Sequence, residues 1–183
     1  VPAMMMNGLC LVVSPLIALM KDQVENLRTK GIPALHIFSG MPYREIVQAL
    51  KNATTGHYKF LYCSPERLHS SLFREYLPGI PLSFVAVDEA HCISQWGYDF
   101  RPAYMNIVSI RELKPGVPFL ALTASATTEV REDIMKQLGF RKGQLFTMSF
   151  ARPNLGYRVI ETDSRIHRCI RILQKNEGSA IVY

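Results

Sequence analysis

Two adjacent carboxylates, Asp88 and Glu89, directly follow the apolar run Leu82–Val87 and are followed by Ala90 and His91. Two such groups leaving a buried strand suit a metal–phosphate site, where one holds Mg²⁺ through water and its neighbour polarises the water that attacks a γ-phosphate. A bare Asp-Glu pair is more commonly a solvated acidic turn. The hydrophobic strand before the pair and the Ala-His step after it favour the catalytic interpretation.

Two Ser-Pro steps occur where other apolar runs end, at Ser14-Pro15 and at Ser64-Pro65. A helix that begins at such a step leaves backbone N–H groups free to bind a phosphate, although plain helix capping explains either step equally well. Strands of a parallel sheet all point the same way. We therefore expect both steps to lie with Asp88 on one carboxyl edge, where open α/β sheets bind ligands.

Small and hydroxyl-bearing residues follow a further apolar run, in the segment Leu120–Thr127. Thr127 or Thr128 is expected to cap the next helix by accepting a backbone hydrogen bond. Taken alone, the segment needs no other explanation. Thr123 and Ala124 nevertheless follow a predicted strand, which places them on the same sheet edge as the Asp-Glu pair.

Four aromatic residues fall within nine positions of one stretch, which begins at the only tryptophan, Trp96. Aromatic side chains in a loop usually anchor it to the body of the protein, and Phe100 and Tyr104 are candidates for that role. Interleaved with Gln95 and Arg101, the aromatics can instead stack on unpaired bases, at about 1–3 kcal/mol per base. We interpret Trp96 and Arg101 as stacking or sensing residues, because they follow the Asp-Glu pair so closely.

Short apolar, β-branched runs alternate with helical patterns, which is typical of βαβ units around a parallel sheet. Helices are predicted after Ser14, which can cap the first of them, from near Pro42, after Ser64-Pro65 and from about Thr128 to Leu138. The first helix has one apolar face: Leu16, Leu19, Met20, Val24 and Leu27. The predicted strands are Leu9–Ser14, Ala34–Phe38, Lys59–Cys63, Leu82–Val87, Phe119–Thr123 and Leu145–Phe150.

The pattern changes after Phe150, where Ala151–Asn154 reads as a linker. A strand over Tyr157–Thr162, an amphipathic helix around Cys169 and a strand over Ser179–Tyr183 are then predicted. These features predict a first domain over residues 1–150, a linker over 151–156 and the beginning of a second domain over 157–183. Because the chain opens and closes inside predicted elements, we interpret it as a fragment.

Composition and charge set broad limits on function. The chain has 183 residues, of which 48% are hydrophobic and 20% charged, as in an ordinary globular domain. No apolar run reaches the roughly 20 residues that span a bilayer. The four cysteines are far apart, without zinc-ligand spacing, which predicts reduced thiols in an intracellular protein and no zinc site. The net charge of +6 suits a polyanionic partner but does not identify one.

Five segments together resemble the RecQ family of DNA helicases, nearly from end to end. The segments are VVSPLIALMKDQV (12–24), YCSPERL (62–68), VDEAHCISQWGYDFRPAY (87–104), LALTASAT (120–127) and FARPN (150–154). The Asp-Glu-Ala-His strand with its aromatic-rich loop is the most specific of them. The resemblance implies an α/β fold: a parallel-sheet, RecA-like (P-loop NTPase) helicase domain that lacks its P-loop strand, plus the start of a second RecA-like domain.

The resemblance also implies roles for individual residues. Asp88 and Glu89 become the Walker B element, with Mg²⁺ held by Asp88 through water, and His91 links the nucleotide site to the aromatic loop or is structural. The implied residues of motif III, which couples nucleotide state to the nucleic-acid face, are Thr123, Ala124, Ser125 and Thr127. The implied nucleic-acid contacts are Ser14, Pro15, Leu16, Ser64, Arg67, Gln95, Trp96, Phe100 and Arg101.

One departure from the family narrows the expected function. None of the 11 glycines is followed by Lys-Ser or Lys-Thr, so the sequence holds no G-x-x-x-x-G-K-S/T phosphate loop. The arginine finger of the family is missing as well. We expect a larger protein to be an ATP- and Mg²⁺-dependent 3′→5′ DNA helicase of recombination and repair, acting on single-stranded and forked DNA, with this chain inactive alone.

The alternative is a catalytically silent module that binds single-stranded nucleic acid. A Walker A motif encoded just upstream of Val1 would favour the helicase, and a start codon there would favour the module. A bacterial cytoplasm is the expected location, or a nucleus if the source is eukaryotic. The oligomeric state is left open.

Overall fold

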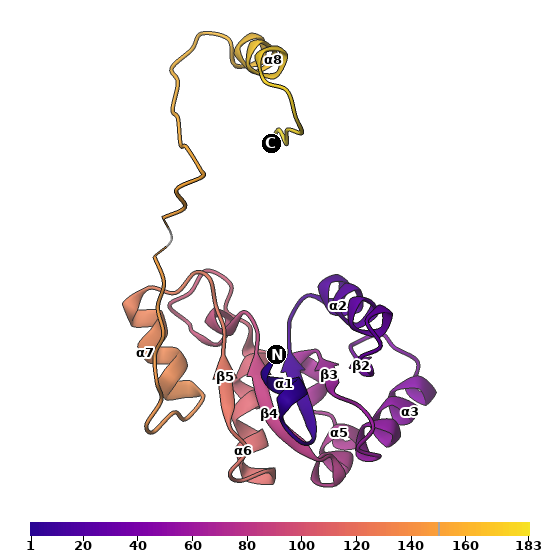
Figure 1. Cartoon of the computed structure of the whole chain (residues 1–183). Helices are drawn as coiled ribbons and strands as arrows, with labels where there is room; N and C mark the ends of the chain where they lie inside the picture. The colour runs from indigo at the N-terminus through magenta and orange to yellow at the C-terminus, as the bar shows by residue number, and fades with distance from the viewer. Residues whose placement is uncertain (150) are drawn as a thin grey trace. The chain divides into compact units, whose positions relative to one another are not determined.

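The computed structural model describes residues 1–149 and 151–183, and it divides into two units, Val1–Gly143 and Gln144–Tyr183 (Figure 1). The first unit is built on one sheet in the order β2-β3-β1-β4-β5, and every neighbouring pair is parallel. This architecture confirms the predicted α/β class. The strands are β1 (Leu9–Val13), β2 (Ala34–Ile37), β3 (Phe60–Cys63), β4 (Leu82–Val87) and β5 (Phe119–Ala121).

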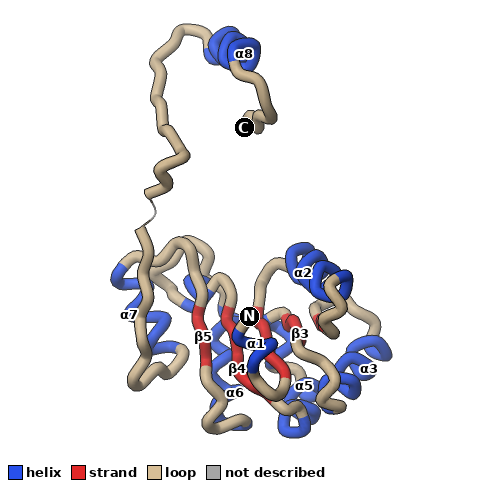
Figure 2. The backbone as a smooth tube through the Cα atoms, in the orientation of Figure 1, coloured by secondary structure: helices blue, strands red, loops and turns tan. Residues whose placement is uncertain are grey.

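Helices cover both faces of this sheet (Figure 2). On one face, Met20 and Val24 of the second helix pack with Tyr62. The larger core lies on the other face, where Leu11 and Val13 are in one cluster with residues such as Leu50, Phe73 and Ile134 from three other helices. Side chains of a strand alternate between the two faces, so β1 contributes to both layers. The helices of the first unit are α1 (Pro2–Met5), α2 (Ile17–Thr29), α3 (Tyr43–Thr54), α4 (Pro65–Leu68), α5 (Ser71–Tyr76), α6 (Ile110–Leu113), α7 (Thr128–Gln137) and the 3₁₀ helices η1 (Leu77–Gly79), η2 (Ala90–Ile93) and η3 (Pro102–Ser109).

The carboxyl ends of the central strands are level with one another. Val13 at the end of β1 is paired with Cys63 of β3 and with Val87 of β4. The hydrogen-bond ladder continues one residue further, since the N–H of Ser14 donates to the carbonyl of Cys63 and the N–H of Asp88 donates to that of Val13. Polar residues that follow different strands therefore meet at one edge, as the sequence predicted.

The start of α2 differs from the prediction. The helix begins at Ile17 and its N-cap is Leu16, which offers no side-chain cap, so Ser14 does not cap it. Leu16 and Leu19 of the predicted apolar face are exposed, whereas Met20 and Val24 are buried. Ser14 Oγ instead donates to a carboxylate on the neighbouring strand, and that interaction replaces the cap.

The second unit contains one helix, α8 (Arg165–Lys175), which confirms the amphipathic helix predicted there. The predicted strands over 157–162 and 179–183 are wrong, because both segments lack strand structure. Residues 145–149 lack it too, and Phe150, the last residue of that predicted strand, lies outside the described residues. A strand exists only where a neighbour completes its hydrogen-bond ladder, and the described residues of this unit supply none. Within the described parts of the chain, no helix is long and apolar enough to cross a membrane.

Gly8 lies directly before β1, in close contact with the backbone that precedes β4. Its φ is +97°, and an added Cβ would lie 2.4 Å from the carbonyl oxygen of Pro81, which accepts the N–H of Leu9. Gly31 also has a positive φ, +72°, but an added Cβ there meets nothing within 4 Å.

We predict that Gly8→Ala is much more destabilising than Gly31→Ala. Both substitutions cost about 1–2 kcal/mol for the left-handed backbone. The clash at Gly8 adds roughly 1–3 kcal/mol, because backbone must move. Urea unfolding followed by circular dichroism measures both, and equal losses would show that Gly8 does not constrain the start of β1.

Candidate functional site

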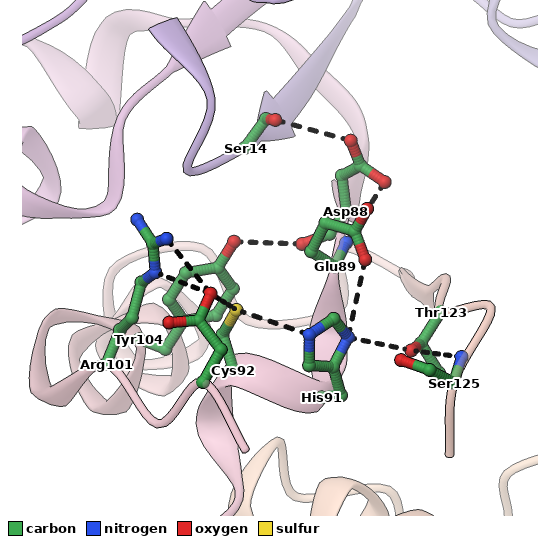
Figure 3. A network of polar contacts seen from close by, with 10 residues as sticks. Ser14, Asp88, Glu89, His91, Cys92, Arg101, Tyr104, Thr123 and Ser125 are labelled. Atoms are coloured by element: carbon green, nitrogen blue, oxygen red, sulfur yellow. Dashed lines mark hydrogen bonds and ion pairs between the residues drawn. The ribbon is translucent and has the colours of Figure 1, made fainter. Parts of the chain in front are cut away.

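The turn after β4 holds the Asp88 carboxylate in place (Figure 3). The hydroxyl of Ser14 donates to Asp88 Oδ2 at 3.3 Å, and the N–H of Glu89 donates to Asp88 Oδ1 at 3.0 Å. Glu89 has φ 46° and ψ 45°, and it is the only non-glycine residue with positive φ among those the structure describes. Such a conformation is uncommon and costly for an ordinary residue, and strained residues of this kind cluster at functional sites.

Buried contacts fix the backbone of this turn. Tyr104 is fully buried and its hydroxyl donates to the carbonyl of Asp88 at 3.0 Å. Burial raises the pKa of Tyr104, which keeps the phenol protonated as a donor. On the other side, the N–H of Ala90 donates to the carbonyl of Leu122, and the N–H of Leu122 donates to that of Val87. The turn is thereby joined to the segment that follows β5.

His91 connects the carboxylates with the segment after β5. Its Nδ1 lies 3.3 Å from Glu89 Oε2 and 3.0 Å from Thr123 Oγ1. Thr123 Oγ1 also accepts the N–H of Ser125 at 3.3 Å. Thr123 therefore lies on the same sheet edge as the Asp-Glu pair, as predicted, and His91 lies between Thr123 and Glu89.

A second polar group lies on the other side of the His91 ring. Cys92 Sγ is 3.8 Å from His91 Nε2 and 3.7 Å from Asp99 Oδ2. Two guanidinium nitrogens of Arg101 donate to the same Asp99 oxygen, at 3.2 and 2.9 Å, and this interaction lowers the pKa of Asp99 and raises that of Arg101. Burial, and next the nearby Asp99, raise the pKa of Cys92 to about 11. Sequence reasoning missed Cys92 and Asp99, and the Asp-x-Arg spacing was the available signal for the ion pair.

The aromatic loop has fixed ends and an exposed tip. Tyr104 is buried, which confirms the anchoring predicted for it, and Phe100 is half-buried. Trp96 and Tyr98 are 79% and 96% exposed, and Gln95 is exposed beside them. Trp96 lines a shallow groove with residues of α7: Glu129, Glu132, Asp133 and Lys136.

The two Ser-Pro steps lie on the predicted edge but expose little of their serines. Ser14 and Ser64 are both 1% exposed, and their N–H groups donate to the carbonyls of Cys63 and Ile37. Ser64 Oγ has no hydrogen-bond partner among the described residues and does not cap α4. Arg67 Nε donates to the carbonyl of Phe38 at 3.1 Å. Among the predicted nucleic-acid contacts at these two steps, Leu16 is exposed, at 45%, and Pro15 is half-buried.

The residues after β5 show one confirmed cap. Thr127 Oγ1 accepts the N–H of Val130 and so caps α7, as predicted. Ala124 and Ser125 are exposed beside it. The implied motif III thus contributes Thr123 to the polar network and Thr127 to the helix.

The donor set at the edge fits Mg²⁺. Carboxylate oxygens are hard ligands of the kind that Mg²⁺ prefers, and it commonly keeps several of its waters. Asp88 offers such a carboxylate, oriented through both of its oxygens, and Glu89 is 35% exposed next to it. The given sequence has no phosphate loop, so it does not contain the residues that would hold the phosphates.

We predict that Tyr104→Phe destabilises the protein by about 1–3 kcal/mol, because the buried carbonyl of Asp88 loses its partner. Tyr98→Phe, at a residue that is 96% exposed, is the matched control and should leave stability unchanged. Urea unfolding compares the two. If Tyr104→Phe were as stable as the control, the hydroxyl would not be fastening the turn.

Comparison with known proteins agrees with this geometry. The chain matches the DEAD/DEAH box helicase family over residues 3–134. It is 45% identical to the ATP-dependent DNA helicase RecQ of Bacillus subtilis, over all of this chain and 31% of that protein. It is 40% identical to RecQ of Pasteurella multocida, over all of this chain and 29% of that protein. The chain therefore spans about a third of the length of these curated relatives.

A solved structure shows the same fold. The Hef helicase domain of Pyrococcus furiosus superposes with a TM-score of 0.54 at 20% identity, covering 74% of this chain and 28% of that one. This likeness supports the RecA-like architecture of the parallel sheet. The chain belongs to the DEAD/DEAH box helicase family, and its similarity to RecQ proteins over its full length confirms the RecQ resemblance seen in its sequence.

Proposed function

We propose that this chain is the first motor domain of an ATP-dependent DNA helicase of the RecQ type. In this proposal Asp88 and Glu89 serve Mg²⁺-dependent ATP hydrolysis, and the loop after η2 senses single-stranded DNA. The similar proteins are named ATP-dependent DNA helicases, which supports the substrate and the nucleotide. The 3′→5′ direction, the action on forked DNA and the role in recombination and repair rest on the RecQ resemblance.

The observation that carries the proposal is the position of His91 between Glu89 and Thr123. Its Nδ1 is within reach of both side chains, at 3.3 and 3.0 Å. In a neutral imidazole, that nitrogen either donates or accepts, so the two partners cannot both receive its proton fully. A movement of Thr123 therefore changes how Glu89 is held, which connects the segment after β5 to the hydrolytic carboxylate.

The protein groups around the scissile phosphate have separate tasks. Bound Mg²⁺ supplies charge neutralisation of the phosphate oxygens. Asp88 is oriented for water-mediated contact by Ser14 and by the N–H of Glu89. Glu89 accepts a hydrogen bond from the attacking water and then its proton, as a general base. His91 is a positioning residue, because it acts through Glu89.

The loop after η2 is well placed to report on DNA. It follows η2, which begins directly after Glu89, and the chain beyond it returns to the same turn through Tyr104 and the carbonyl of Asp88. The N–H of Arg101 also donates to the carbonyl of Cys92 at 2.8 Å. Force on the exposed tip at Trp96 is therefore transmitted to the residues on either side of the hydrolytic carboxylate.

The groove beside Trp96 affects how DNA can approach. Glu129, Glu132 and Asp133 place three carboxylates there against one ammonium, that of Lys136. Such a surface repels phosphates. We infer that bases reach the indole ring from the side away from α7, with the DNA backbone over other parts of this basic chain.

The alternative is a catalytically silent module that binds single-stranded nucleic acid. It makes the same claim about DNA and differs only about ATP. The two functions can be distinguished by experiments on a protein that joins this chain to a G-x-x-x-x-G-K-S/T segment.

In such a protein we predict that Glu89→Gln still binds ATP but lowers kcat by roughly 10²–10⁴-fold, because an amide cannot take the proton of water. Glu112→Gln, at an exposed residue of α6, is the matched control and should leave both kcat and ATP affinity unchanged. Single-turnover hydrolysis and nucleotide binding are measured separately.

Equal losses of ATP binding and turnover in Glu89→Gln would show that Glu89 is structural. The 183-residue chain without a phosphate loop is the negative control of the same assay. DNA-stimulated ATP turnover by this chain alone would contradict our proposal that its own residues are insufficient.

We predict that single-stranded DNA changes the fluorescence of Trp96, and that Trp96→Ala weakens binding by about 1–3 kcal/mol. Tyr43→Ala, an exposed aromatic of α3, is the matched control and should bind normally. Anisotropy of a labelled oligonucleotide measures affinity, which should fall steeply with salt. Unchanged fluorescence at saturation, or equal affinities of the two variants, would exclude stacking on Trp96.

A further inference from the structure

His91, Cys92 and Asp99 bring three metal-ligand atoms together. Figure 3 shows Cys92 on the side of the His91 ring away from Glu89. The three atoms all lie within 4.8 Å of one another. Cys92 Sγ is 3.8 Å from His91 Nε2 and 3.7 Å from Asp99 Oδ2. Tetrahedral Zn²⁺ with its usual bond lengths separates a sulfur and a nitrogen ligand by about 3.5 Å. Both distances that involve sulfur are thus within a few tenths of an ångström of what the ion needs.

We propose that His91, Cys92 and Asp99 form a binding site for Zn²⁺. Imidazole nitrogen, thiolate sulfur and carboxylate oxygen are the ligand types of zinc, and three protein ligands leave a fourth position for water. The same donors are poor ligands for Mg²⁺, which prefers oxygen, so this site is distinct in its chemistry from the one at Asp88.

The other nitrogen of His91 supports the assignment independently. Nδ1 is 3.3 Å from Glu89 Oε2, so the ring can donate its N–H to a carboxylate while Nε2 faces the metal position. Metal-binding histidines nearly always have such a partner, which fixes the tautomer and makes the ligand nitrogen more basic. The structure places this partner without any rearrangement of the ring.

This proposal goes against the expectation from sequence that the chain has no zinc site. Cysteine spacing carried that expectation, and the cluster contains only one cysteine. Cysteine spacing could not show this cluster, because the fold brings its members together. His91 and Cys92 are neighbours in η2. The N–H of Arg101 donates to the carbonyl of Cys92, and this hydrogen bond brings Asp99 close to both.

Two changes accompany binding. The Cys92 thiol, protonated at neutral pH, exchanges its S–H bond for an S–Zn bond and its proton passes to solvent. Arg101 releases Asp99 Oδ2, which is inexpensive because both side chains are partly exposed, at 35% and 54%. The ion therefore enters from the exposed Asp99 side of the cluster.

Occupancy has a consequence that rests on the proposed function. With Nε2 on the metal, the remaining proton of the ring is on Nδ1, and Glu89 is held as its acceptor. Glu89 is then less available to take the proton of water, and the loop is clamped at its Cys92 and Asp99 ends. Zn²⁺ is accordingly expected to inhibit DNA-stimulated hydrolysis in a protein that carries the whole ATP site.

The experiment uses the reduced 183-residue chain and Co²⁺ as a spectroscopic substitute for Zn²⁺. We predict a thiolate-to-cobalt charge-transfer band that Zn²⁺ abolishes by competition. Cys92→Ala removes the band, whereas Cys169→Ala, at the half-buried cysteine of α8, retains it. Asp99→Asn, at an exposed residue with no role in the core, weakens Zn²⁺ binding roughly 10-fold or more.

Persistence of the band in Cys92→Ala, or Zn²⁺ affinity unchanged by Asp99→Asn, would overturn the site. The second variant keeps the test decisive if removal of Cys92 disturbs folding. The readout is metal binding by the chain itself, so its failure leaves the hydrolytic proposal untouched. Conversely, an active Glu89→Gln protein would end the hydrolytic proposal and leave the zinc site standing.

Discussion

The continuation of the sheet's hydrogen-bond ladder beyond the strand ends is the constraint on which the site depends. Asp88 N–H reaches the carbonyl of Val13, Ser14 N–H that of Cys63, and Leu122 N–H that of Val87. These backbone hydrogen bonds thus fix the positions of the polar residues independently of any side-chain contact. The Ser14–Asp88 contact needs no long or flexible side chain, because the sheet has already brought the two residues together.

This constraint explains which parts of the site were predictable. Apolar runs identify the strands, parallel strands share a direction, and the residues after them must share an edge. Asp88 and Thr123 were found in this way. The contact of Ser14 with Asp88 was not, because capping and cross-strand bonding use the same hydroxyl and the local sequence does not choose between them. Cys92 and Asp99 depend on the path of a loop, for which the pattern of apolar residues carries no information.

The missing strands of the second unit show the limit of local pattern. Tyr157–Thr162 and Ser179–Tyr183 have the apolar and β-branched residues of strands, yet neither forms one. A helix completes its own hydrogen bonds, so α8 forms from local sequence and a side-chain cap by Ser164. A strand depends on a partner elsewhere. Local composition therefore predicts helices in an isolated segment better than it predicts strands.

The left-handed backbone conformation of Glu89 depends on contacts made by the segments around it. A residue held in that region costs roughly 1–3 kcal/mol, and it persists only where its surroundings determine it fully. Here the Tyr104 hydroxyl and the carbonyl of Leu122 hold the turn from both sides. The chain that carries the exposed Trp96 shares the Tyr104 contact with this turn. We propose that small movements of this loop shift Glu89, whose left-handed backbone these contacts maintain.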